Sequence, residues 1–419
     1  MFIPKPEVVY AAAKTMADIT LRLNTVEIVT PLNAHAEKDK WLNAAQKGVF
    51  RNPTFTYDYA FLSNIAQLES ELLSARHQLL DNLKPQNLID EILLEIINDR
   101  IEDAHASIKL AQAILNRDDA TSEYYTAKKF GRPNAVQIAE AERLTMFGHT
   151  LGVYEPLFDK DQRKALKNMR FDATQISEHF RRAIDYYGIE GWIIVIDEHA
   201  TAIDVRNKTA NGTPCIVIPS SREVNGLKLL ELIGHEIECH LRDSENAAQL
   251  FRDLIGSDSP LMPLVPLLAK PDDEMMYEGH AKLSDVRFSG SSALPKPFYT
   301  IAQYRAVQRN SFAEVANHIY ELQLNLDQSE SAAVKGAWLA TYRALRGVTD
   351  TKNPHGYTFG KDYGYLAGFS IARDLQRRNW LDYASLRLID LQRLGACAEL
   401  DHPKYPYKDA VQYVASRLM

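Results

Sequence analysis

Residues 231–246 read ELIGHEIECHLRDSEN, and the rest of the chain is organised around this stretch. His235, Glu236 and His240 form the pattern H-E-x-x-x-H in a sequence with helical periodicity. Imidazole nitrogens suit Zn²⁺, which catalytic sites hold with one coordination position left open for water. A carboxylate between the two imidazoles can accept a proton from that water. The stretch therefore indicates a metal-binding helix with Glu236 as its general base.

The two histidines stand one residue further apart than in the usual helical pattern H-E-x-x-H. In a regular α-helix, side chains at i and i+5 lie about 140° apart around the axis, too far to bind one ion. A π-type turn, with hydrogen bonds spanning five residues, brings them to within roughly 50° of each other. The spacing therefore predicts a π-bulge between His235 and His240. An ordinary helix that carries two histidines by chance is the alternative.

A third ligand is available in residues 271–288, PDDEMMYEGHAKLSDVRF, which have an acidic start and helical spacing. Glu278 can complete a His-His-Glu set, as in catalytic zinc peptidases. Asp285 falls on the same face seven residues later, where it can act as an outer partner for a ligand imidazole. The competing interpretation makes Glu278 a solvated helix residue. His280 is expected to point away from Glu278, at a pocket wall or on the surface.

These motifs resemble those of a known family. Residues 235–240 (HEIECH) followed by 277–281 (YEGHA) are similar to the pairing of H-E-x-x-x-H with Q-E-G-L-A. That pairing occurs in the bacterial QEGLA-motif proteins and in the microtubule-associated tyrosine carboxypeptidases. Residues 52–57 (NPTFTY), 349–351 (TDT) and 358–362 (TFGKD) also match, so the resemblance spans most of the chain.

The resemblance implies a gluzincin-like zinc metallopeptidase. His235, His240 and Glu278 would be the metal ligands, and Glu236 the catalytic base. It also implies a carboxypeptidase that removes one residue, an aromatic one in the named family, from the C-terminus of a peptide or protein. The chain departs from the pattern where Tyr277 and His280 replace Gln and Leu, which leaves substrate preference open.

Composition narrows the class of protein. The chain has 419 residues, 46% hydrophobic and 25% charged, as in ordinary soluble globular proteins. The net charge of −7 and the lack of a long basic run argue against nucleic acid as a partner. No apolar run reaches the roughly 18 residues of a membrane span, and the N-terminus does not read as a signal peptide. We therefore expect a cytoplasmic protein without a membrane partner.

Cysteine usage points the same way. Cys215, Cys239 and Cys397 are few, odd in number and widely spaced, which argues against a disulfide framework and fits a reducing compartment. Cys239 lies inside the zinc motif but next to His240, so it should point away from the metal. We expect it to be a small core residue.

The predicted fold is mainly α with a small antiparallel β-sheet (α+β). Residues 1–188 read as successive helices, a helical N-terminal region packed on a catalytic region at 189–419, or one continuous domain with it. Three period-two runs, at 192–196, 201–205 and 215–218, predict an antiparallel meander. The run 215–218 or its neighbour is a candidate edge for an extended peptide, although a purely structural sheet is equally compatible. Residues 219–221 (PSS) are expected to cap the next helix.

The loop at 347–360 fits neither periodicity, and long loops in compact domains are often functional. A carboxypeptidase needs a cation for the terminal carboxylate, preferably a bidentate Arg, and a donor for the developing oxyanion. Arg346, Lys361 and Tyr365 are the candidates for these substrate-binding roles. Helix ends and ordinary packing would account for them equally well.

Two rival functions stay open. The chain could be a dipeptidyl peptidase or aminopeptidase-type zinc peptidase, because dipeptidyl peptidase III also has the lengthened motif. An acidic cluster near the metal would favour that type, since it must hold a free amine. The chain could also be a non-catalytic helical binding protein with a structural zinc, closed by a fourth protein ligand such as Cys239. The sequence does not determine the oligomeric state.

Overall fold

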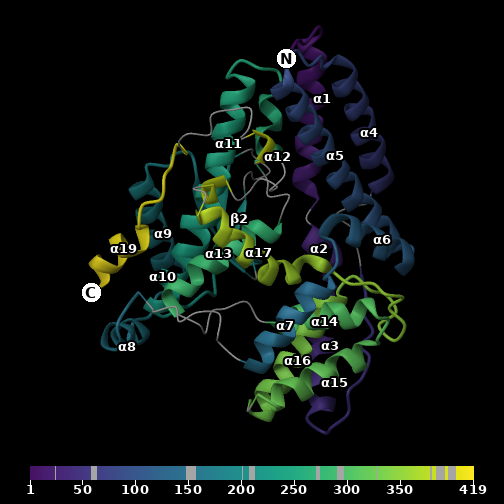
Figure 1. Cartoon of the computed structure of the whole chain (residues 1–419), viewed down its shortest axis with the longest axis vertical. Helices are drawn as coiled ribbons and strands as arrows, with labels where there is room; N and C mark the ends of the chain where they lie inside the picture. Colours follow the sequence, from purple (N-terminus) through teal and green to yellow (C-terminus); the bar gives the residue numbers. More distant parts are fainter. Residues whose placement is uncertain are drawn as a thin grey trace.

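Helices form most of the protein, and the described strands form one small sheet (Figure 1). The structure is a computed structural model of the whole chain. It describes residues 1–23, 25–57, 64–147, 157–200, 202–206, 213–269, 274–289, 297–326, 328–377, 380–383, 392–394 and 403–419. The predicted α+β class with a predominance of helix is therefore confirmed.

The helices before the sheet are α1 (Pro6–Arg22), α2 (Thr25–Val29), α3 (Ala34–Ala45), α4 (Ile65–Asn82), α5 (Leu88–Leu115), α6 (Asp119–Phe130), α7 (Ala135–Phe147), α8 (Lys160–Asn168) and α9 (Ala173–Tyr187). The strands are β1 (Ile193–Asp197), β2 (Asp204–Arg206) and β3 (Cys215–Pro219). Then come α10 (Gly226–Leu232), the π-helix η2 (Ile233–Leu241), α11 (Arg242–Ile255), η3 (Met262–Leu264), α12 (Val265–Leu268), α13 (Glu274–Ser289) and α14 (Pro297–Val307). The last described helices are α15 (Phe312–Leu324), α16 (Glu330–Leu345), η5 (Gly360–Tyr363), α17 (Gly364–Arg377), η6 (Leu381–Tyr383) and α19 (Ala410–Leu418).

The sheet differs from the predicted antiparallel meander. Its order is β1-β3-β2, with β1 parallel to β3 and β2 antiparallel to β3. Every residue of β3 is buried, and a continuous apolar run of this kind is typical of a central strand. The run 215–218 is therefore not an edge, whereas its neighbour β2 is. Position 201 of the second predicted strand lies outside the described residues.

The start of α10 also differs from the prediction. Its N-terminus is capped by Asn225, whose side-chain oxygen accepts a hydrogen bond from the backbone N–H of Lys228 at 2.9 Å. Residues 219–221 end the sheet but do not cap this helix, because several residues separate them from its first turn. An Asn at the N-cap satisfies an otherwise unpaired backbone donor as well as Ser does.

The hydrophobic core has two main clusters among the described residues. The larger one joins α1, α4 and α5 to α14, α15 and α16, and includes Trp41, Phe312 and Trp338 in mutual ring contact. The second packs α9, β3, α10, η2 and α19 together. Each cluster draws residues from both sides of position 188. The division into regions 1–188 and 189–419 stays a prediction.

Two of the matching motifs join distant parts of the chain. The Tyr57 hydroxyl donates to the backbone carbonyl of Val348 at 3.1 Å and accepts from the N–H of Gly347 at 2.8 Å. The Thr351 hydroxyl donates to the carbonyl of Pro53. These bonds hold residues 52–57 against 347–351, so the two motifs build the frame that carries the loop leading to η5.

Helices α13 and α17 lie against each other near the middle of the view in Figure 1. Their backbones approach closely at Gly279, where a Cβ atom would lie 2.0 Å from the carbonyl carbon of Gly368. Only glycine fits such an approach. The contact fixes the position of the preceding residue, Glu278.

None of the described helices has both the length and the hydropathy of a membrane span.

Candidate metal centre

The H-E-x-x-x-H stretch forms the π-helix η2, which confirms the π-type geometry predicted from its spacing. The wider turn places His235 and His240 on one side of the helix. Their ring centroids are 4.8 Å apart, and the ring planes are nearly perpendicular at 89°. A regular α-helix would separate these side chains. The irregular turn therefore creates a pair of neighbouring imidazoles.

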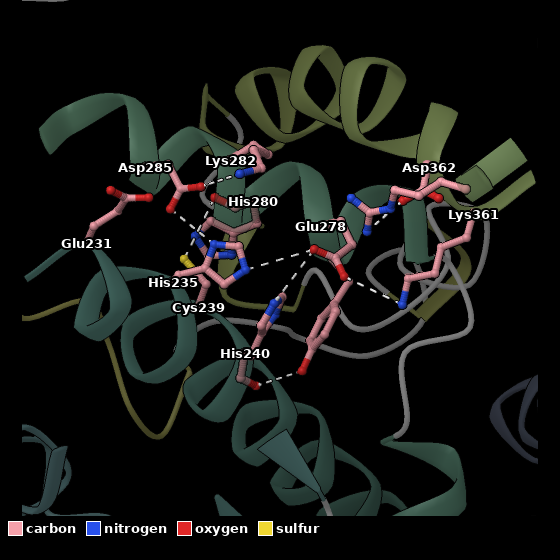
Figure 2. Close-up of polar contacts among 12 residues, drawn as sticks. Glu231, His235, Cys239, His240, Glu278, His280, Lys282, Asp285, Lys361 and Asp362 are labelled. Carbon is pink, nitrogen blue, oxygen red and sulfur yellow. Dashed lines mark hydrogen bonds and ion pairs between the residues drawn. The ribbon is translucent and has the colours of Figure 1, made fainter. Parts of the chain in front are cut away.

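The α13 helix brings Glu278 to the same point. Its Oε2 lies 4.0 Å from Nε2 of His235 and 3.9 Å from Nε2 of His240. Each of the three residues offers a ligand atom, and these atoms all lie within 4.8 Å of one another. Figure 2 shows the carboxylate facing both rings from the opposite helix.

These residues fit a zinc ion. The distances of 3.9 and 4.0 Å from Glu278 to the two imidazoles are too long for hydrogen bonds, so the three groups do not satisfy one another. A cation about 2.0–2.2 Å from each ligand atom would occupy the space between them. Two imidazole nitrogens and one carboxylate are also the donor set of several catalytic zinc sites.

Asp285 orients the first imidazole. Its Oδ1 lies 3.1 Å from Nδ1 of His235, and its Oδ2 accepts from the Lys282 ammonium at 2.5 Å. Burial favours a neutral imidazole, but the Asp285 carboxylate outweighs it and raises the pKa of His235 to about 9. Burial also acts against the Asp285 charge, yet His235 and Lys282 hold its pKa well below the usual range. An ionised Asp285 is thereby fixed against the ring, leaving Nε2 to face Glu278.

Glu236 is buried beside this pair. Burial, with further contributions from the carboxylates of Glu278 and Asp204, raises the pKa of Glu236 to about 7. A carboxyl group with this pKa can both accept and donate a proton at neutral pH. For His240, burial and the neighbouring His235 hold the pKa well below its ordinary value. His240 is therefore neutral, the form in which imidazole binds a metal.

The residues behind the two histidines form a buried polar layer. Cys239 is buried as expected, with its thiol 3.7 Å from the carbonyl oxygen of His280. His280 does not lie on the surface, because its Nδ1 is 2.6 Å from Oδ2 of the fully buried Asp243. It points away from Glu278 as predicted, but that direction faces α11 and not solvent. The sequence pattern gave no signal for this pairing across two helices.

Glu238 ties the same π-helix to the end of the chain. Its carboxylate is buried, accepts from the backbone N–H of Val411 at 3.0 Å and pairs with Arg287 at 3.3 Å. Arg287 also binds Asp409 at 2.8 Å. Burial outweighs these contacts and raises the pKa of Glu238 to about 7. The segment leading into α19 is thus anchored to the back of η2.

The three predicted substrate-binding residues differ in their surroundings. Lys361, on η5, places its ammonium 3.7 Å from Oε1 of Glu278, on the side away from the imidazoles (Figure 2). The ring of Tyr365 lies 5.7 Å from the Lys282 ammonium. Arg346 is buried, lies over the ring of Phe359 and pairs with Asp362 at 3.6 Å. Lys361 therefore contacts the His-His-Glu cluster directly.

Comparison with known proteins gives one family match. The sequence model of a family described as "Microtubule-associated tyrosine carboxypeptidase" matches residues 44–389. This range includes η2, α13 and η5, which carry the residues described above. No curated protein and no solved structure matches the chain.

Proposed function

Because the chain belongs to the microtubule-associated tyrosine carboxypeptidase family, we propose that it is a zinc-dependent carboxypeptidase. In this proposal it removes one residue, an aromatic one such as tyrosine, from the C-terminus of a peptide or protein. The observation that carries it is the convergence of His235, His240 and Glu278 within 4.8 Å, beside the buried Glu236. Together with the family match, this arrangement supports a gluzincin-like peptidase centre.

His235, His240 and Glu278 would hold the metal. Zn²⁺ held there would act as a Lewis acid toward the scissile carbonyl and would lower the pKa of water toward about 7. Glu236 accepts the proton of the attacking water and passes it to the leaving amine. Asp285 and Lys282 keep the His235 ring in place during the reaction.

Lys361 binds the terminal carboxylate of the substrate in this proposal. Its ammonium lies at the outer side of Glu278, within reach of a chain end held at the cluster. Arg346, paired with Asp362, has a supporting role, because that contact anchors the residue next to Lys361 in η5. Tyr365 is the candidate donor for the developing oxyanion.

Strand β2 offers a place for the substrate backbone. It is an edge strand, it contacts η2, and its Asp204 is close enough to affect the pKa of Glu236. An extended peptide can add to such an edge through main-chain hydrogen bonds. This position would align a peptide along the helix that carries the proposed base.

Two observations favour a carboxypeptidase over its rivals: the charge beside the cluster and the number of ligands in it. An aminopeptidase or dipeptidyl peptidase must hold a free amine, whereas the side chain at the outer oxygen of Glu278 is the cation Lys361. A structural zinc requires a fourth protein ligand. Among the described residues, His235, His240 and Glu278 form the single cluster of three or more potential metal ligands. Cys239 does not supply a fourth ligand to it, because its thiol is directed toward the carbonyl oxygen of His280.

Matched peptides test the proposal. We expect a peptide ending in tyrosine to lose that residue, its C-terminally amidated twin to stay intact, and N-acetylation to have no effect. Mass spectrometry identifies the residue released. Prolonged dialysis against a chelator should abolish release, and zinc should restore it. Cleavage of the amidated peptide from its N-terminus would instead support the aminopeptidase type.

A further inference from the structure

The two imidazoles of η2 are held in different ways. Nδ1 of His235 has a carboxylate partner, Asp285, at 3.1 Å. Nδ1 of His240 is buried and has no hydrogen-bond partner within the part of the chain that the structure describes. Metal-binding histidines usually use this second nitrogen to fix the orientation of the ring. Some other contact must therefore orient His240.

That contact is the ring of Tyr277. It stacks on the His240 imidazole with a centroid separation of 3.9 Å and an angle of 22° between the planes. The Tyr277 hydroxyl lies 3.4 Å from the backbone carbonyl of His240, which anchors the phenol along the same residue. The His240 ring also lies nearly perpendicular to the ring of His235, with centroids 4.8 Å apart. Two aromatic neighbours thus restrict the ring where hydrogen bonding does not.

We propose that Tyr277 is the positioning residue of His240, doing through its aromatic face what Asp285 does for His235 through a hydrogen bond. This inference rests on the proposed function, because it assigns Tyr277 a role in presenting Nε2 of His240 to the metal. Tyr277 directly precedes Glu278 on α13. One turn of helix therefore supplies a ligand and the surface against which another ligand is aligned.

Zinc affinity, measured by competition with a chromophoric chelator on the full chain, tests the role of the ring. Tyr277→Phe keeps the aromatic face and removes the hydroxyl, so we expect its affinity to stay within about twofold of wild type. Tyr277→Leu removes the face, and we expect affinity to fall about 10- to 100-fold, the range for loss of an outer partner of a metal ligand. Tyr186→Leu is a control for the loss of a stacked tyrosine, because the ring of Tyr186, on α9, stacks on that of Tyr413, on α19, with centroids 4.3 Å apart.

Each outcome decides the inference. Equal affinity of Tyr277→Leu and wild type overturns it, and so does an equal loss in Tyr277→Phe, since the hydroxyl would then be the essential group. Melting temperatures show whether the variants fold, and Tyr277→Met, whose longer and more flexible side chain adapts better to an irregular space, replaces Tyr277→Leu if the latter does not. Wild-type protein that binds no zinc would overturn the proposed function itself. Zinc-binding wild type with an unaffected Tyr277→Leu variant overturns only the role of Tyr277.

Discussion

Nε2 of His240 and Oε2 of Glu278 lie 3.9 Å apart, although the two residues belong to different helices. The separation exceeds a hydrogen bond and suits two ligands on either side of one ion. The same is true of His235 and Glu278. Packing of α13 against η2 therefore brings together three donors of the kinds that bind zinc, from two separate helices.

The proposed base can be separated from the metal ligands. Glu236→Gln should keep stoichiometric zinc but lower peptide-release activity by about 100- to 10,000-fold, because the amide cannot accept a proton. Elemental analysis and a release assay on the same preparation measure both quantities. Glu231→Gln, a carboxylate neutralised in the preceding helix, is the control. Full activity in Glu236→Gln would end the proposed mechanism.

Removing an imidazole should remove the metal. We expect His240→Ala to lose bound zinc, because two ligands hold a tetrahedral ion poorly. His179→Ala provides a matched control, since His179 is also buried but lies on α9. Inductively coupled plasma analysis of both proteins after gel filtration gives the metal content. A stoichiometric ion in His240→Ala would show that the ligand set is wrong.

Neutralising Lys361 should weaken substrate binding more than turnover. Lys361→Met is expected to raise KM for a free C-terminal carboxylate by about 10-fold or more, with a smaller change in kcat, because a charge-assisted contact is lost. Lys361→Arg should recover most of the affinity, and Lys352→Met, an exposed loop lysine, should behave as wild type. An unchanged KM in Lys361→Met would exclude this residue as the carboxylate-binding cation.

Adding one methyl group at Gly279 should disturb both stability and metal binding. In Gly279→Ala the new Cβ would meet the backbone of Gly368, so α13 and α17 must separate. We expect a loss of about 1–3 kcal/mol in the free energy of unfolding, as for other overpacked sites. Urea unfolding measures this loss, and zinc titration shows whether Glu278 has moved. A variant with wild-type values for both would disprove the importance of the close contact.

Glu69 predicts a pH dependence of stability. Burial alone would raise its pKa, but hydrogen bonds from Lys109, His105 and Gln112 lower it to about 2. The carboxylate therefore stabilises the fold fully above its ordinary pKa of 4.5, and this contribution fades as pH falls toward 2. Glu69→Gln should melt at a lower temperature than wild type at pH 7, with the gap closing in acid. A gap that is constant between pH 7 and pH 3 would contradict this linkage.

The local geometry of the H-E-x-x-x-H stretch was more predictable than the sheet. The π-helix followed from the spacing of His235 and His240, because only one helical geometry brings such positions together. The pairing of strands did not follow, since a period-two pattern reports which residues are buried and not which strands are neighbours. Contacts across helices, such as His280 with Asp243 and His240 with Tyr277, also left no trace in the spacing. They depend on how α13 packs against η2 and α11.

The amide of Val411 that binds Glu238 has a consequence for truncation. A chain cut short before this residue would lose almost all of α19, and the Glu238 carboxylate would keep Arg287 as a partner but lose its backbone donor. Water would then reach this carboxylate, which lies on the same π-helix as the two imidazoles. Truncation at the tail would thus disturb the helix that presents His235 and His240, although neither histidine had been altered.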